Sequence, residues 1–367
     1  MRIVDQGIIS RPPRGGAYMA AITPLPDGSY IACQFVSSTF VSSDARIEVL
    51  RSTDGLATWA SEGQLRGQAA AEDGWSYRGP TISVIPDGRL LMRATRFHAD
   101  RISETFDAES ESLQQSENLI YWSHDLGRTW SAPQLVTVDL DPTRYTANGS
   151  GTLLQLAHDR WMYPMETWKP VGYDGPTDQK AIALYSADQG RTWGELTVVA
   201  DDPTGETNWW DYAATVLPDG RIYNMVWAHR YRAVEDLPNH WLESTDQGRT
   251  WSEPRPTNLL GQMCVPIALP DGRVAAVYNH RRDPQGVHVA LTEDLEHFDV
   301  DNKVVAFDAG REAILGNPGP TSLAINMAQG FGRPRGTLLA DGSLLVYLWG
   351  TVDGFSHTRW VRISLER

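Results

Sequence analysis

Three histidines stand at regular distances after a repeated turn, in positions where an imidazole could transfer protons. His98, His229 and His280 follow the aspartates of three Pro-Asp-Gly turns by 11, 10 and 9 residues. Imidazole titrates near neutral pH, so such a ring can act as a general acid or base, bind a metal ion, or hydrogen-bond within the wall of a site. We take His229 as a candidate catalytic group and His98 and His280 as candidate substrate contacts, and we expect no metal site.

Arginines are frequent in the same parts of the sequence, although the chain as a whole is acidic. It has 32 basic and 46 acidic residues and a net charge of −14. A planar guanidinium binds a carboxylate through two parallel hydrogen bonds, so a cluster of arginines suits an acidic sugar. Alternatively, each arginine pairs with an acidic neighbour. The candidate substrate-binding arginines are Arg78, Arg96, Arg230, Arg281 and Arg333.

Composition narrows the class of protein further. Apolar residues make up 41% of the 367, which is typical of a globular chain with a substantial core. A charge of −14 repels phosphate backbones and anionic lipids, so neither nucleic acid nor membrane is expected as a partner.

Cys33 and Cys264 lack CxxC partners, which favours two free thiols over a disulfide. No signal-like segment is present, so we expect a cytoplasmic protein unless the chain is a trimmed form of a secreted one.

A repeated turn organises the elements that must position these side chains. Apolar runs flank each Pro-Asp-Gly or related sequence, and proline followed by Asp-Gly is typical of a tight turn between two strands. The turn aspartates are Asp27, Asp87, Asp159 (in a degenerate copy), Asp219, Asp271 and Asp341. Their spacings of 60, 72, 60, 52 and 70 residues leave room for a four-stranded sheet and one long loop in each of six units.

A second motif alternates with these turns. It has a serine, an aspartate two residues later, a glycine and a final Thr-Trp pair. Copies occupy Ser52–Trp59, Ser123–Trp130, Ser186–Trp193 and Ser244–Trp251, with a worn copy at Thr292–Phe298. Short polar side chains bond nearby backbone in a tight turn, and tryptophan fills space between neighbouring sheets. We therefore interpret these boxes as folding elements rather than catalytic ones.

These boxes resemble the Asp-box (BNR) repeats of the sialidase-like family. The resemblance implies an all-β, six-bladed β-propeller of four-stranded antiparallel sheets, with residues 1–367 as a single domain. Radial repetition agrees with this fold, because each sheet buries its face on its neighbours. Residues 3–10 and 360–365 are expected to share the closing blade. The blades are expected to begin near Arg14, Tyr77, Ala147, Asp211, Met263 and Arg333.

Strand direction places the candidate residues at one end of such a propeller. The Pro-Asp-Gly turn joins strands one and two of a blade, and the Asp box joins strands three and four. The start of strand one and the end of strand two therefore lie at the opposite end, where the first strands surround a common mouth. Polar and aromatic residues expected there include Tyr77, Arg93, Asn148, Trp168, Trp210, Gln262, Arg335 and Trp349.

The resemblance also implies roles for individual residues. Sialidases hold the substrate carboxylate with three arginines, use a tyrosine and a glutamate as nucleophile and helper, and use an aspartate as acid–base. Arg78, in Tyr77-Arg78-Gly79-Pro80, resembles the arginine of the family's Arg-x-Pro motif. Asp211 takes the slot of the helper glutamate, whereas Arg333 takes the slot of the tyrosine.

Other candidates complete this catalytic set. Tyr18, in Gly16-Ala17-Tyr18-Met19, resembles the tyrosine motif at a different point in the chain. Glu166 is a second candidate carboxylate. The proton donor would be one of Asp44, Asp100 and Asp107.

Three functions are compatible with these residues. The first is an exo-acting glycoside hydrolase of the sialidase-like superfamily that acts on an acidic or related sugar. The second is a lyase on uronate-containing glycans, with a His or Tyr base and an arginine that neutralises the carboxylate. The third is a carbohydrate-binding propeller without catalysis. We expect a carbohydrate partner and no cofactor. The polar segment 101–118 is either a lid over the mouth or a solvated loop.

Overall fold

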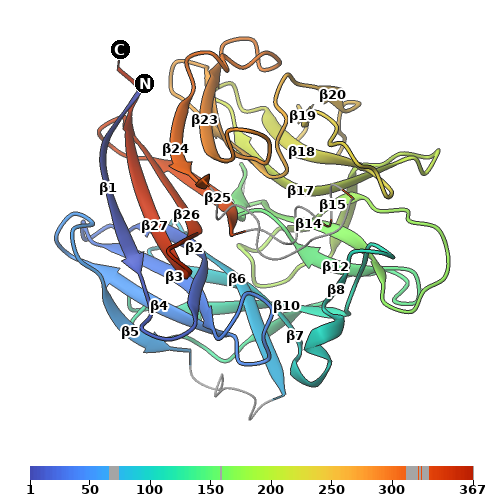
Figure 1. Ribbon diagram of the computed structural model, residues 1–367, viewed down its shortest axis with the longest axis horizontal. Helices are drawn as coiled ribbons and strands as arrows, with labels where there is room; N and C mark the ends of the chain where they lie inside the picture. Colours follow the sequence, from blue (N-terminus) through green and yellow to red (C-terminus); the bar gives the residue numbers. More distant parts are fainter. Residues whose placement is uncertain (66–73, 158, 311–320, 322–323, 325–329, 367) are drawn as a thin grey trace.

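The structure is a β-propeller whose sheets are arranged around a central axis (Figure 1). This computed structural model describes residues 1–65, 74–157, 159–310, 321, 324 and 330–366. Within these ranges six sheets are present, five of which have four strands. The degenerate turn around Asp159 includes residue 158, which lies outside the described residues.

The four-stranded sheets follow one another along the chain. The first contains β2 (Gly16–Pro24), β3 (Tyr30–Ser37), β4 (Arg46–Ser52) and β5 (Ala60–Gln64). The second contains β6 (Trp75–Val84), β7 (Leu90–His98), β10 (Ser116–Ser123) and β11 (Gln134–Val136). Two later sheets contain β17 (Thr207–Val216), β18 (Ile222–Arg230), β19 (His240–Ser244) and β20 (Arg255–Pro256), and β21 (Cys264–Ala268), β22 (Val274–His280), β23 (Gly286–Thr292) and β24 (Val304–Asp308).

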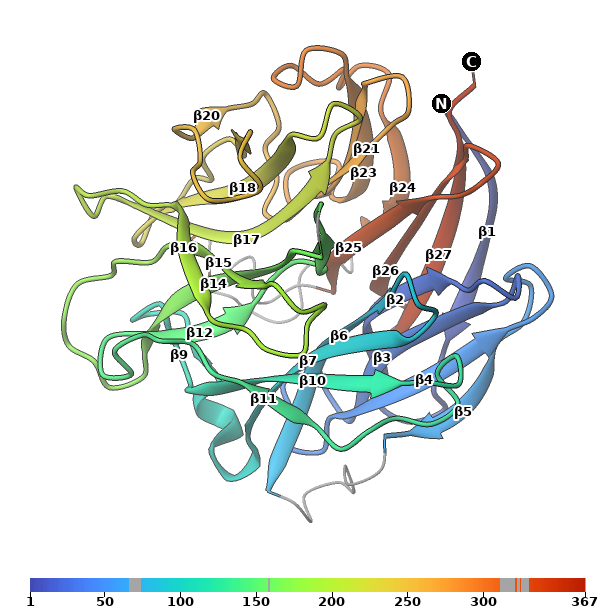
Figure 2. The same cartoon turned by 180° about the vertical axis from the view of Figure 1, so that it is seen from behind.

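The two ends of the chain meet in one sheet. It contains β25 (Phe331–Leu338), β26 (Leu344–Val352), β27 (Phe355–Ser364) and β1 (Arg2–Ser10). β1 runs antiparallel to β27, with Arg2 opposite Ser364. The N- and C-termini consequently lie close together, as both views show (Figures 1 and 2).

The remaining sheet departs from the expected four strands, so the prediction of six four-stranded blades is wrong at this position. It contains β12 (Thr146–Gly149), β13 (Leu154–Gln155), β14 (Trp161–Pro170), β15 (Ala181–Ser186), β16 (Glu195–Ala200), β8 (Phe106–Asp107) and β9 (Ser112–Leu113). Its first strand is split, because β12 and β13 both pair with β14. The strand β9, from an insertion between β7 and β10, adds to the end of β14 in parallel.

Burial explains why these short strands form a propeller. Inner strands are covered on both faces: every residue of β26 except its last is buried. The outermost strand β5, by contrast, is exposed along its whole length.

The 3-10 helix η1 (Ala99–Glu104) lies in the insertion between β7 and β10. No helix within the described residues is long and apolar enough to cross a membrane. Cys33 and Cys264 are buried free thiols, as predicted.

The Asp boxes join strands three and four, as predicted. In the second box, Asp125 accepts hydrogen bonds from the backbone N–H and the hydroxyl of Thr129, at 2.8 and 2.6 Å. The Ser123 hydroxyl bonds Asp125 and accepts the N–H of Gly127. Asp188 and Asp246 make the same pair of bonds in their own boxes.

This geometry predicts the cost of removing one box. Asp125→Ala should lower the free energy of unfolding by about 1–3 kcal/mol, because the turn loses the acceptor for three donors. Urea unfolding followed by tryptophan fluorescence measures the change. Asp139→Ala is a suitable control, since Asp139 lies outside the box, and a loss of equal size in both variants would contradict a folding role for the box.

Candidate active site

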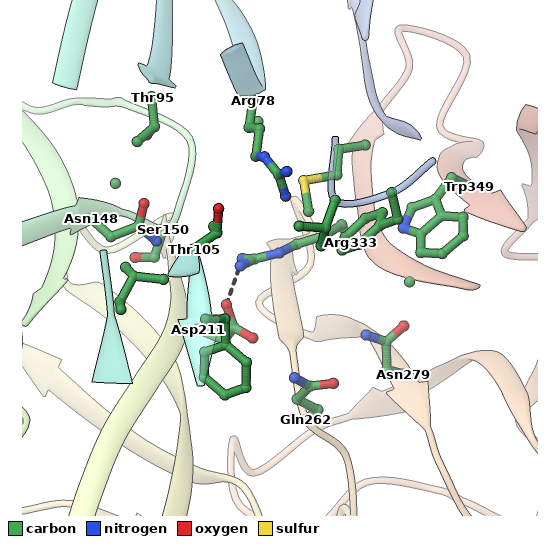
Figure 3. Close-up of a pocket in the computed structure, with 18 of the residues that line it drawn as sticks. Arg78, Thr95, Thr105, Asn148, Ser150, Asp211, Gln262, Asn279, Arg333 and Trp349 are labelled. Atoms are coloured by element: carbon green, nitrogen blue, oxygen red, sulfur yellow. Dashed lines mark ion pairs between the residues drawn. The ribbon is translucent and has the colours of Figure 1, made fainter. Parts of the chain in front are cut away.

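A cavity lies on the axis at the end predicted to form the mouth. All six sheets contribute to its wall, and Figure 3 shows several of the side chains that point into it. Its polar lining consists of Arg78, Arg93, Thr95, Thr105, Asn148, Ser150, Asp211, Gln262, Asn279, Arg281, Arg333 and Arg335. Its apolar lining includes Met19, Phe40, Phe97, Phe106, Leu113, Trp168, Trp227, Phe331 and Trp349.

A repeated β-bulge on the first strand of four sheets aims residues at this cavity. The pairing register shifts between Tyr18 and Ala21, Arg78 and Thr81, Trp210 and Ala213, and Gly332 and Arg335. Within these bulges Met19, Gly79, Asp211 and Arg333 have positive φ, between 46° and 57°. Such backbone is unfavourable for residues other than glycine and is typical of functional positions. All four residues line the cavity.

Asp211 is the carboxylate that the cavity wall presents. Its Oδ1 lies 2.5 Å from a terminal nitrogen of Arg333, and the two side chains point toward each other in Figure 3. Its backbone N–H donates to Oε2 of Glu166 at 2.6 Å. Asp211 is 5% exposed, so it is shielded from bulk water but open to the cavity.

Glu166 lies behind Asp211 and holds it from the backbone side. Oε1 of Glu166 accepts hydrogen bonds from Trp168 at 2.8 Å and Asn148 at 3.1 Å. The carboxylate is fully buried and does not line the cavity. Burial raises the pKa of Glu166, and the negative charge of Asp211 adds to the rise. Glu166, predicted from the sequence as a second candidate catalytic carboxylate, therefore holds the backbone of Asp211 and does not face the cavity.

The raised pKa of Glu166 has a consequence for stability. The folded-state pKa lies above the ordinary value of 4.5, so the contribution of Glu166 to stability is complete below pH 4.5 and is lost as the pH rises through the folded-state pKa. The difference in unfolding free energy between wild type and Glu166→Gln should thus fall by roughly 1 kcal/mol or more on going from pH 4 to neutral pH. Urea unfolding across this range measures it. Glu253→Gln, at an exposed position, is the control, and a parallel profile for wild type and Glu166→Gln would contradict the assignment.

Three arginines, Arg78, Arg281 and Arg333, line the part of the cavity nearest the mouth, which we call the upper cavity. Arg78 and Arg281 are each 8% exposed, and burial lowers the pKa of both, that of Arg78 to about 10. Arg281 donates to the side chain of Gln262 and the carbonyl of Phe331. The Nε and one Nη of Arg78 are buried without a hydrogen-bond partner among the described residues. Such buried guanidiniums with free N–H groups are chemically suited to pair with an anion.

The insertion 99–115 forms one wall of the cavity. Thr105, Phe106 and Leu113 line it, so segment 101–118 is neither a free loop nor detached from the mouth. Glu111 fixes this wall to the sheet of β17–β20. Its Oε1 accepts from the backbone N–H of Arg232 at 2.8 Å and faces Nε2 of His229 at 3.0 Å.

Several predicted catalytic residues lie away from the cavity lining. Tyr18 packs against Phe35 and Trp349 with ring centroids 5.1 and 5.2 Å apart, and burial raises the pKa of its hydroxyl. The bulge turns the neighbouring residue, Met19, into the cavity instead. Asp44 is held by hydrogen bonds from Ser38 and Ser42 in the loop after β3.

The three candidate histidines also lie outside the cavity lining. His229 is 1% exposed, stacked on Trp210 at 5.1 Å and paired with Glu111, behind the cavity wall. His98 is the last residue of β7, and its ring is tilted against that of Trp75 with the ring centroids 4.2 Å apart. His280 stacks on His288 at 4.7 Å. The three rings lie at the predicted end of their strands, but none of them lines the cavity.

The remaining predicted substrate contacts also divide into residues that line the cavity and residues that do not. Arg78, Arg281 and Arg333 line the cavity, together with Asp211. Arg96 instead pairs with Glu117, and its guanidinium lies 4.0 Å from the ring centre of Trp75. Three further candidates lie outside the lining: Tyr77 and Trp210, which are buried, and Arg230, which is exposed.

The sequence contained an unused signal for other cavity residues. Thr95, Trp227, Asn279 and Trp349 each lie eight residues after the turn aspartate of their own sheet, and all four line the cavity. The bulge residues lie eight residues before the turn aspartate, so the two sets of cavity residues are spaced symmetrically about the turn. Counting symmetrically from the turn would have identified Thr95 and Asn279, which the sequence analysis missed.

Comparison with known proteins agrees with this architecture. A family model described as BNR repeat-like domain matches residues 28–313. The chain belongs to this family. The predicted resemblance of this BNR repeat-like protein to the sialidase-like superfamily is thereby confirmed. Among proteins with curated descriptions, no sequence matches it.

Solved structures resemble the BNR repeat-like protein over almost its whole length. A protein of unknown function from Dyadobacter fermentans has a TM-score of 0.77 at 18% identity, covering 100% of this chain and 99% of that one. An α-L-arabinanase from Penicillium chrysogenum, complexed with arabinobiose, has a TM-score of 0.67 at 15% identity, with coverage of 100% and 99%. The intramolecular trans-sialidase from Ruminococcus gnavus, complexed with oseltamivir carboxylate, has a TM-score of 0.65 at 13% identity, with coverage of 98% and 96%. These likenesses show a shared fold.

Proposed function

We propose that this protein is an exo-acting glycoside hydrolase whose substrate carries a carboxylate on the sugar bound in the axial cavity. The observation that carries the proposal is the charge of the lining. Five arginines and one described carboxylate, Asp211, surround a single buried cavity in a protein of net charge −14. Buried charges are costly without a partner, so the lining favours an anionic ligand.

The geometry suggests a division of roles. Arg78 and Arg281, which pair with no described carboxylate, would bind the sugar carboxylate. Asp211 would face the anomeric carbon and stabilise the positive charge that develops as the glycosidic bond breaks. Water would complete the hydrolysis, its hydroxyl forming the new bond to the anomeric carbon and its proton passing to the leaving-group oxygen. Arg333 would hold Asp211 in place through their ion pair.

Exo action is supported by the closed wall of the insertion. Phe106 and Leu113 flank the cavity on one side, and Phe40 and Trp349 flank it as well. Phe106 is braced edge-on against Trp168, with ring centroids 5.6 Å apart. A pocket enclosed in this way favours a chain end over the interior of a polymer.

The two alternatives are less well supported. The lyase needs a base beside the substrate, but neither His229 nor Tyr18, the bases considered for it, lines the cavity. A binding module without catalysis does not require an aspartate held at positive φ by an ion pair and a buried glutamate.

A substrate panel tests the proposal. It should contain aryl glycosides of uronic and nonulosonic acids, aryl arabinofuranosides, and uronate-containing oligosaccharides, with reducing ends and ultraviolet absorbance followed together. We expect release from acidic glycosides without the absorbance of an unsaturated product. Absorbance rising with cleavage would identify the lyase instead, and cleavage of the arabinofuranosides alone would refute the acidic substrate.

A further inference from the structure

Two further arginines meet at the floor of the cavity, apart from those that face the sugar. Arg93 comes from β7 and Arg335 from β25, in sheets separated by the sheet of β2–β5. One terminal nitrogen of each donates to the same acceptor, the carbonyl oxygen of Ser150, at 2.9 and 3.3 Å. The two guanidiniums are therefore brought together at one atom.

Their positions along the strands place them deeper than the upper arginines. Arg93 lies six residues after its turn aspartate and Arg335 six before its own, whereas Arg333 lies eight before and Arg281 ten after. Because the turns mark the end opposite the mouth, the backbones of these two residues lie further from the mouth than that of Arg333 does.

Neither floor arginine has a counter-charge among the described residues. Arg93 is 1% and Arg335 is 5% exposed. Their other acceptors are all neutral: Thr81, Gly149 and Thr152. Burial lowers the pKa of both groups, that of Arg335 to about 9. The positive charge of Arg333 adds to the lowering of both pKa values, and that of Arg93 adds to the lowering of the Arg335 pKa. Two adjacent buried cations are unfavourable unless an anion joins them.

Unused hydrogen-bond donors remain at the same place. A guanidinium has five N–H groups, of which Arg93 uses three and Arg335 two in the hydrogen bonds above. The hydroxyl of Ser150, which lines the cavity and is fully buried, has no hydrogen-bond partner among the described residues. Asp211 is already engaged by Arg333.

We propose that Arg93, Arg335 and the Ser150 hydroxyl form a second anion-binding site at the cavity floor, suited to a tetrahedral oxyanion. The ligand is a sulfate or phosphate group, either free in solution or carried as an ester by the bound sugar. This site goes beyond the proposed hydrolase, because it binds a group other than the sugar carboxylate.

Thermal unfolding in the presence of inorganic sulfate tests the site at constant ionic strength. The Tm of wild type should rise with sulfate and approach saturation. Arg93→Gln and Arg335→Gln should lose at least a tenfold factor in apparent sulfate affinity, and Arg335→Lys should lose less than Arg335→Gln because it keeps the charge. Arg273→Gln, in a turn at the far end where Arg273 pairs with Asp271, should behave as wild type. Equal sulfate responses in wild type and both glutamine variants would overturn the proposal.

A second measurement distinguishes the two sources of the anion and rests on the proposed function. If the ligand is free, sulfate should raise Tm further when an acidic sugar already saturates the upper cavity. If the ligand is an ester, sulfate should compete with a sulfated sugar for binding. The sulfated sugar should also bind at least tenfold tighter than its unesterified parent. In Arg335→Gln this difference in affinity should disappear. A wild-type protein without glycosidase activity would refute the proposed hydrolase, but its Tm would still rise with sulfate. The hydrolase and the anion site are therefore tested independently.

Discussion

Asp211→Asn should lower kcat/KM on the best acidic glycoside by roughly 10²–10³-fold, the range that one preorganised electrostatic contact to the transition state supplies. Asparagine has nearly the same shape, so the bulge and the hydrogen bond from its N–H to Glu166 can persist. What disappears is the negative charge opposite Arg333 and beside the reacting carbon. Initial rates at several substrate concentrations separate the effect on kcat from that on KM.

The matched control for this variant is Asp219→Asn. Asp219 occupies the turn at the opposite end of the same sheet, where it binds Arg221. We expect its activity to equal that of wild type. If Asp211→Asn retained full activity with a normal unfolding curve, Asp211 would not be the catalytic carboxylate.

Arg78→Gln should weaken the binding of an acidic sugar by about 30-fold or more, which corresponds to about 2 kcal/mol for removing one partner of a buried charge pair. The same variant should unfold at the same or a higher denaturant concentration than wild type in the absence of ligand. The reason is that Arg78 is buried with two nitrogens unpaired, so its charge is a cost to the free protein. Calorimetric titration with the sugar and urea unfolding measure the two effects.

Opposite changes in binding and stability distinguish a ligand-binding arginine from a structural one. Arg89→Gln provides the comparison, because Arg89 pairs with Asp87 in the turn that ends the same strand. It should leave sugar affinity unchanged. A loss of stability in Arg78→Gln as large as the loss of affinity would show that Arg78 serves the fold.

The repeat pattern was sufficient to predict the architecture, because each turn and each Asp box acts locally. Asp125 bonds residues four positions away or fewer, so its role can be inferred from the sequence. The two strands that the second repeat adds to the third sheet could not be predicted in this way. β9 joins β14 across more than 50 residues, and no local motif specifies that pairing.

The candidate site was predicted only where strand counting sufficed. Arg78, Asp211, Arg281 and Arg333 were placed correctly, but Tyr18 was not. A β-bulge adds one residue and changes which side chain faces the axis, so Met19 enters the cavity while its neighbour packs against Trp349. Glu166 required the three-dimensional structure, since its role depends on a bond to the backbone of a residue 45 positions away.

A crystal structure of the Asp211→Asn variant with an acidic aryl glycoside tests the central claim most directly. We predict that the sugar occupies the axial cavity, with its carboxylate within hydrogen-bonding distance of Arg78 and Arg281 and its anomeric carbon facing residue 211. A sugar bound in the same cavity with its carboxylate turned to solvent, or bound only on the outer surface of the sheets, would contradict it.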